Sequence, residues 1–225
     1  MRVKNLPWIP FAFFAIVIGL YPLTYYLLNT DHFGLFHQKP IQLVRNFYWH
    51  TAFYIHITFG GIALLTGWTQ FSQRLRYKYI NAHRFVGKIY VIAVMLSSVA
   101  ALFIAVFAIG GIITTTGFGV LAILWFFTIS KAYTSILKGN IIQHENWMVR
   151  NYALTFSAVT LRIWMPAFQL IAHWDFITAY HIVSWLCWVP NLIIAEIMMG
   201  RNKNVPLKIS FLKSRQSSLK NNCDF

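Results

Sequence analysis

The chain is poor in acidic residues and in cysteine. Its 225 residues include five Asp or Glu against nineteen Lys or Arg, and its two cysteines are Cys187 and Cys223. One cysteine lies in an apolar segment and the other in a polar tail, so they do not suggest a disulfide framework. The sequence also lacks a CxxCH motif, and any heme would therefore be bound without a covalent link. The HExxH motif is absent too, which makes a metal-dependent intramembrane enzyme the least favoured class and leaves no catalytic residue to name.

Long apolar runs dominate what is present. Hydrophobic residues make up 58% of the chain and charged residues 11%, with a mean hydropathy of +0.56, whereas a soluble domain has about 25% charged residues. The apolar stretches are about 20 residues long, enough for a helix to cross about 30 Å of hydrocarbon. The sequence therefore predicts an all-α, polytopic membrane bundle with transmembrane helices over 8–28, 47–67, 86–109, 117–137, 152–173 and 177–199, followed by a basic cytoplasmic tail at 201–225.

The net charge of +14 is unevenly distributed along the chain. One set of alternate loops has little more than Lys39 and Arg45, and the other set and the termini carry most of the Lys and Arg. Short loops rich in Lys and Arg face the cytoplasm, so this pattern predicts that both termini are cytoplasmic in a multi-pass protein of the cell membrane. The same pattern argues against a nucleic-acid partner and favours the lipid bilayer.

The eight histidines fall mostly in or at the ends of the apolar segments. An imidazole in hydrocarbon is costly unless it is paired or bound, which makes such residues functional candidates. His83 and His144 are expected at one membrane face, on separate helices and at a common depth. There they could be the two axial ligands of a b-type heme or part of a metal site; equally, they could be interfacial histidines bonded to lipid headgroups or loop carbonyls.

The remaining intramembrane histidines are expected from the middle of the bilayer toward the opposite face. A second pair could form there between His56 or His50 and His181 or His173. Four candidates compete for two positions, so the sequence does not select the pair.

Arg162 is expected near the middle of the fifth segment. A guanidinium there costs at least about 2.5 kcal/mol and stays protonated, and no carboxylate is expected at its depth. It could bind an anionic group of a ligand, such as a heme propionate or a substrate carboxylate. Alternatively, it could donate to backbone carbonyls, including one released by Pro166. Arg150 is a second candidate for a propionate contact.

Two phrases carry a resemblance to a known family. "GWTQFSQRLRYKYINAHRFVGKIYV" at 67–91 and "HENWMVRNYALTFSAVTLRIWMP" at 144–166 resemble the signature stretches of a bacterial family of predicted membrane proteins, domain of unknown function 2306. That family has no established activity. The resemblance implies that its signature includes His83, Arg84, His144, Trp147, Met148, Arg150 and Arg162.

The chain is more loosely similar to the six-helix diheme b-type cytochromes, which place four histidines in two tiers on a four-helix core. It departs from that pattern because the segment 117–137 contains no histidine. A single inner heme between His83 and His144 is still compatible with the sequence.

Two functional hypotheses follow. In the first, a heme-b membrane protein passes electrons between a membrane quinone or another redox partner and an acceptor, with His83 and His144 as axial ligands. In the second, the protein is a proton-linked transporter or sensor of a small anion, with Arg162 as the anion contact and His56 as the titrating group. The sequence shows no inverted repeat, which would have favoured a transporter.

Overall fold

The computed structural model describes residues 8–28 and 38–203, and these ranges contain helices but no strand. Helices formed by long apolar runs account for most of them. In chain order the elements are α1 (Trp8–Leu20), α2 (Leu23–Leu27), α3 (Ile41–Val44), α4 (Phe47–Gly67), the 3-10 helix η3 (Trp68–Phe71), α5 (Gln73–Lys78), α6 (Ile80–Ala105), α7 (Ile112–Leu137), α8 (Ile141–Thr155), α9 (Ser157–Leu170), α10 (Phe176–Leu186) and α11 (Val189–Lys203).

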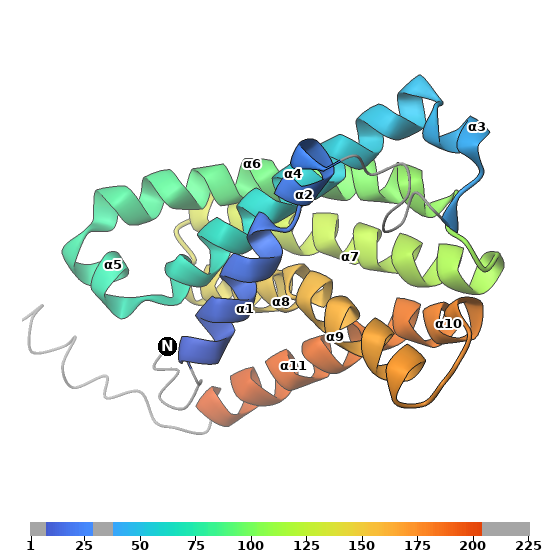
Figure 1. The fold of residues 1–225 in the computed structure, drawn as a ribbon. Helices are drawn as coiled ribbons and strands as arrows, with labels where there is room; N and C mark the ends of the chain where they lie inside the picture. The colour runs from blue at the N-terminus through green and yellow to red at the C-terminus, as the bar shows by residue number, and fades with distance from the viewer. Residues whose placement is uncertain (1–7, 29–37, 204–225) are drawn as a thin grey trace, which may run out of the picture.

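The long helices form one elongated bundle with two ends (Figure 1). We call these the α5 end and the α3 end, after the short helix that lies at each. The chain traverses the bundle in alternating directions: α4 ends, α6 begins, α7 ends and α8 begins at the α5 end. Helix α1 also begins there, and α11 ends there. Helix α4 packs along α6, and α7 packs against α6 and α8, while α10 and α11 close the other side against α7, α9 and α8.

Five stretches of helix in the described ranges are long and apolar enough to cross a membrane, by length and composition. They are Ile9–Leu27, Phe47–Phe71, Ile80–Ala105, Ile112–Leu137 and Phe176–Gly200. The predicted fold class, a helical membrane protein with several spans, is therefore confirmed. Five of the six predicted segments correspond to these stretches, with the helix at 47–67 matched at both ends.

The predicted segment 152–173 is not one continuous helix. Residues 152–155 end α8, and α9 begins at Ser157 after a tight turn in which the Val159 N–H donates to the Phe156 carbonyl. Helix α8 begins with the polar stretch that contains His144, and α9 has only 14 residues. Together they make one pass from the α5 end toward the α3 end (Figure 1).

Prolines account for two other interruptions. Helix α1 ends at Leu20 and the chain resumes as α2 after Pro22, and the break between α10 and α11 precedes Pro190. A proline has no N–H to donate and its ring crowds the preceding turn. The sequence predicted one uninterrupted helix for each of the segments 8–28 and 177–199, and the structure corrects this prediction by showing a break in each.

Candidate functional site

Arg162 lies on α9, one turn before Pro166. Its Nη1 donates to the carbonyl oxygen of Ala158 at 2.9 Å, and its Cζ lies 4.5 Å from the ring centroid of Tyr21. Within residues 8–28 and 38–203, no carboxylate forms an ion pair with it. One backbone bond and one aromatic face leave most of the five guanidinium N–H groups available. The predicted contact between the guanidinium and a backbone carbonyl is thus present, although the acceptor, Ala158, is not the carbonyl that Pro166 releases. This contact uses only some of the N–H groups of Arg162.

His56 lies on α4 and is held by Ser97 of α6. The imidazole Nδ1 is 3.0 Å from Ser97 Oγ and 3.2 Å from the Ser97 carbonyl oxygen, while Ser97 Oγ donates to the His56 carbonyl at 2.8 Å. A carbonyl oxygen only accepts, so these contacts assign the proton to Nδ1. In the neutral ring, Nε2 is then the open proton acceptor.

These two residues lie near one another, although 106 positions separate them in the chain. His56 and Arg162 are close enough to interact electrostatically, and Tyr21 and Tyr25 act on the same guanidinium. The His56 ring is perpendicular to the Trp125 ring, with centroids 6.3 Å apart. The guanidinium of Arg162, with unused N–H donors, is thus within electrostatic range of the His56 imidazole, with its open Nε2, and the rings of Tyr21 and Trp125 contact these two groups. We call the set Arg162, His56, Ser97, Tyr21 and Trp125 the arginine–histidine site.

A buried polar network fixes the wall of this site. Trp125 Nε1 donates to Thr155 Oγ1 at 2.9 Å, and the same oxygen lies 2.9 Å from Tyr90 Oη. Tyr90 Oη donates to Asn151 Oδ1 at 2.5 Å, and Asn151 Nδ2 donates to the Trp125 carbonyl and to Thr128 Oγ1. Sequence reasoning did not identify this network. The sequence offers little signal for it, because Asn151 follows Arg150 in a helix that already contains several polar residues.

His83 and His144, the predicted inner pair, lie in one polar cluster at the α5 end. Arg76 of α5 forms a 2.5 Å ion pair with Glu145, and both residues, together with His144, act electrostatically on His83. His144 Nδ1 lies 2.9 Å from the carbonyl oxygen of Ala132, which leaves its Nε2 open. His83 Nδ1 is buried and has no hydrogen-bond partner among the described residues. The structure therefore brings the two imidazoles into one cluster.

The cluster is not a ready metal centre of three or more ligands. Within the described ranges, no three His, Cys, Asp or Glu side chains lie close enough together to hold a metal ion. Glu145, the carboxylate nearest in sequence to His144, is committed to Arg76. His144 fits the pattern of a ligand whose Nδ1–H is held by a carbonyl. The structure therefore gives no support to the predicted metal site at His83 and His144, and bound heme remains a prediction.

The other two predicted site residues have partners of their own. His181 Nε2 lies 2.7 Å from the carbonyl oxygen of Gly110, in the connection between α6 and α7 where Gly110 has a φ of +94°. Arg150 donates from Nε and Nη2 to both carboxylate oxygens of Glu196 on α11, and its Cζ lies 4.7 Å from the Trp147 ring centroid. His50 and His173, the other candidates for the outer pair, are exposed.

One titratable group stands out at the α3 end. The ammonium of Lys39 donates to the Phe107 carbonyl and lies 5.8 Å from the centroid of the Trp49 ring. Burial lowers the pKa of Lys39 to about 8, because the charged form loses its hydration. This lysine therefore loses its charge at a lower pH than a solvated one.

Comparison with known proteins identifies one matching family. The family model described as predicted membrane protein (DUF2306) matches residues 53–199, more than half of the chain. The matched range contains every predicted site residue except His50, one of the candidates for the outer pair. No curated protein and no solved structure matches the chain.

Proposed function

The chain belongs to the DUF2306 family of predicted membrane proteins, and we propose that it binds a small anion together with a proton at the arginine–histidine site. One observation carries this proposal: Arg162 has no carboxylate partner among the described residues, and it is within electrostatic range of His56, an imidazole with an open Nε2. A guanidinium is always charged, and in a bilayer it is retained where it pairs with something. An anion from outside the chain would supply that partner.

The alternating passes of the bundle support a six-span topology for this proposal. The pass made by α8 and α9 would be the fifth crossing, broken at Phe156. Basic residues gather at the α5 end, among them Arg74, Arg76, Lys78 and Lys138. The positive-inside rule then orients that end to the cytoplasm and the protein in the cell membrane. The beginning of α1 and the end of α11 would lie on the same cytoplasmic side.

The site offers a direct coupling between anion and proton. An anion on Arg162 would bring a negative charge close to His56 and favour a proton on Nε2. By linkage, a protonated His56 would raise the affinity for the anion by the same factor, typically about 5- to 150-fold for coupled sites. The interior of the bundle strengthens this attraction because its dielectric is low.

Uptake into proteoliposomes tests the proposal. The probes are radiolabelled chloride, lactate and succinate, with the external pH lowered from about 7.5 to about 5.5, across the range in which histidine titrates. We expect acid-stimulated uptake of at least one probe. Arg162→Gln should abolish it, and His56→Gln should retain residual uptake without the stimulation by acid.

His50→Gln is the matched control, since His50 lies on the same helix but is exposed. It should behave like the unaltered protein. Uptake that survives Arg162→Gln, or that responds to pH equally in His56→Gln, would refute the proposal. So would the absence of uptake and of thermal stabilisation by all three probes.

A second candidate function is electron transfer through a b-type heme. It is favoured by the polar cluster at the α5 end, where His83 and His144 each keep a ring nitrogen without a hydrogen-bond partner among the described residues. When bound, the heme would supply one-electron chemistry with a quinone or another redox partner. The residues of the chain would hold the iron through the two imidazoles.

The visible absorption spectrum of detergent-purified protein tests this second candidate. A Soret band lost in the His83→Ala, His144→Ala double variant and kept in His50→Ala would support it. Protein purified after expression with added heme precursor that shows no Soret band would rule it out.

A further inference from the structure

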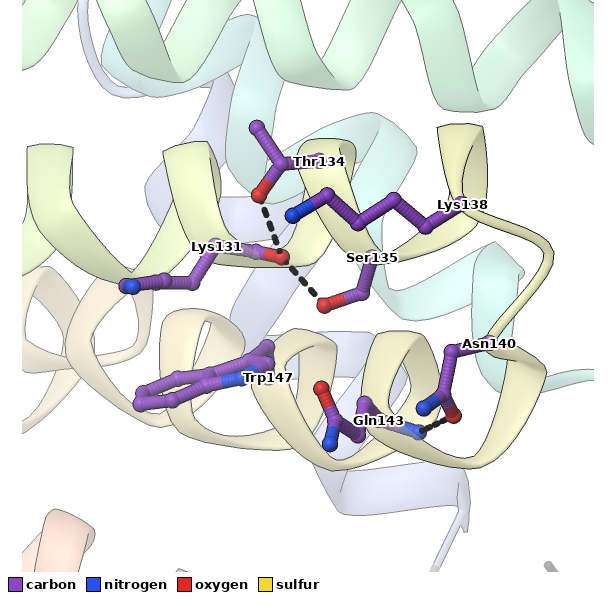
Figure 2. A pocket seen from close by; sticks show the side chains of 7 residues that line it. All are labelled: Lys131, Thr134, Ser135, Lys138, Asn140, Gln143 and Trp147. Carbon is purple, nitrogen blue, oxygen red and sulfur yellow. Dashed lines mark hydrogen bonds between the residues drawn. The ribbon is translucent and has the colours of Figure 1, made fainter.

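A cavity of about 310 Å³ opens at the α5 end, between the end of α7 and the start of α8 (Figure 2). This volume is at the lower limit of small-molecule sites. The two charged side chains that line it, Lys131 and Lys138, are both cationic, and no acidic residue contributes to the lining. The other lining groups are polar or aromatic: Thr134, Ser135, Asn140, Gln143 and Trp147.

The polar groups that line the cavity differ in whether their hydrogen-bond donors are already used within the protein. Ser135 Oγ donates to the Lys131 carbonyl at 2.7 Å, and Thr134 Oγ1 donates to the Ser130 carbonyl at 2.8 Å, so both hydroxyl protons are used within α7. Neither lysine pairs with a carboxylate in the part of the chain that the structure describes. The two ammonium groups, the side-chain amides of Asn140 and Gln143 and the indole N–H of Trp147 are therefore the donors that the lining residues supply. This donor set fits an anion with several oxygens.

The aromatic side of the cavity suits the membrane interface. Lys131 Nζ lies 5.5 Å from the centroid of the Phe127 ring, and that ring packs perpendicular to the Trp147 ring with centroids 5.7 Å apart. Figure 2 shows Lys138 turned back along α7, while Lys131 extends beside Trp147. Tryptophan side chains and lysine stems with a polar tip are favoured at headgroup level.

The position of the cavity indicates how the anion would arrive. It lies at the end of α7, which is one of the five candidate spans. Leu137, Ile141 and Ile142 next to it are more than 60% exposed, as expected of residues that contact lipid. Basic pockets between membrane helices at the cytoplasmic side bind the headgroups of anionic lipids. The cavity thus has lipid-facing residues on its rim and cations in its wall.

We propose that this cavity binds a phosphate group, carried by the headgroup of an anionic phospholipid. The two ammonium groups pair with the phosphate oxygens, Gln143 donates to the same group, and Trp147 contacts the glycerol region. The site is separate from the arginine–histidine site and does not depend on its function.

Native mass spectrometry and thermal unfolding of the detergent-purified protein test this inference. The probes are dioleoylphosphatidylglycerol, dioleoylphosphatidylcholine and inorganic phosphate. We expect phosphatidylglycerol to bind and to raise the unfolding temperature more than phosphatidylcholine does. In the Lys131→Gln, Lys138→Gln double variant its affinity should fall about 25-fold, at about fivefold for each basic residue near an anionic headgroup.

The matched control is the Lys78→Gln, Lys88→Gln double variant, which removes two exposed lysines near the same end but outside the cavity. It should keep the affinity for phosphatidylglycerol. A Lys131→Arg, Lys138→Arg variant should also keep it, which separates loss of charge from loss of folding. Equal losses in the two Gln double variants would overturn the proposal. Stabilisation by inorganic phosphate as strong as by phosphatidylglycerol would overturn the lipid source and identify a soluble phosphate ester as the ligand.

Discussion

Replacement of Asn151 by leucine tests the network that holds the wall of the arginine–histidine site. The Asn151 side chain is fully buried and makes three hydrogen bonds, at 2.5, 2.9 and 2.8 Å. Leucine has the same branched arrangement of heavy atoms, so the substitution removes the bonds without opening a cavity. A hydrogen bond between membrane helices contributes about 0.6 kcal/mol on average, which gives a loss of about 2 kcal/mol.

The loss of stability is not larger because the hydrogen-bond partners of Asn151 have other partners of their own. Tyr90 Oη still lies 2.9 Å from Thr155 Oγ1, and Thr128 Oγ1 still donates to the Leu124 carbonyl at 2.8 Å. No buried hydroxyl is left without a bond, so the full penalty of an unsatisfied group does not arise. A double-mutant cycle with Tyr90→Phe should then give a coupling energy of about 0.6 kcal/mol.

The free energy of unfolding in a mixed-detergent titration measures both quantities. Asn146→Leu is the control, because Asn146 lies on the same helix and its side chain forms no hydrogen bond within the described ranges. Its effect should stay within about 0.5 kcal/mol. A stability of Asn151→Leu equal to that of the control would show that the amide contributes no net stability, and the reasoning would fail.

Three further perturbations test packing, pH dependence and surface charge. In Gly67→Ala the new Cβ would lie 2.3 Å from a ring carbon of Tyr152, so we expect a loss of about 1–3 kcal/mol in unfolding free energy, whereas Gly119→Ala, with open space around it, should be neutral or stabilising. The pKa of Lys39 in the folded protein is about 8, below its usual value of 10.5. Between these two pH values the unfolded chain binds more protons than the folded one, so the free energy of unfolding should rise from about pH 8 toward pH 10.5. The rate of Lys39 acetylation, followed by peptide mass spectrometry, should show a midpoint near pH 8, and a midpoint like that of exposed lysines would refute the assignment. Arg150→Gln breaks a partly exposed ion pair with α11 and should cost less than about 1 kcal/mol, a value that salt should reduce; a larger loss would show that the pair is more deeply desolvated than its exposure indicates.

The fold class was readable from the sequence because hydropathy and helix length depend on local composition. The limits of the helix at 47–67 were predicted correctly, since Asn46 caps its first turn and the polar sequence after Gly67 ends the apolar run. The break between α8 and α9 was missed for the opposite reason, whereas Pro22 and Pro190 mark the other two breaks in the sequence. Phe156 carries no helix-breaking side chain, so the turn between α8 and α9 arises from tertiary packing that a hydropathy pattern does not contain.

The same distinction separates the parts of the candidate site. The cost of a guanidinium in an apolar helix is a property of one residue and its neighbours, so Arg162 was identifiable from the sequence alone. The partner of His56 was not, because Ser97 lies 41 positions away on another helix and is an ordinary small residue in its own segment. The proximity of His56 to Arg162 likewise depends on how α4 and α9 are placed in the bundle. His83 and His144 were predicted at a common depth, but the ion pair between Arg76 and Glu145 beside them required the position of α5. Sequence therefore indicated which side chains need a partner, and only the packed bundle showed which partners they have in the described part of the chain: at Arg162 these are the Ala158 carbonyl and the Tyr21 ring.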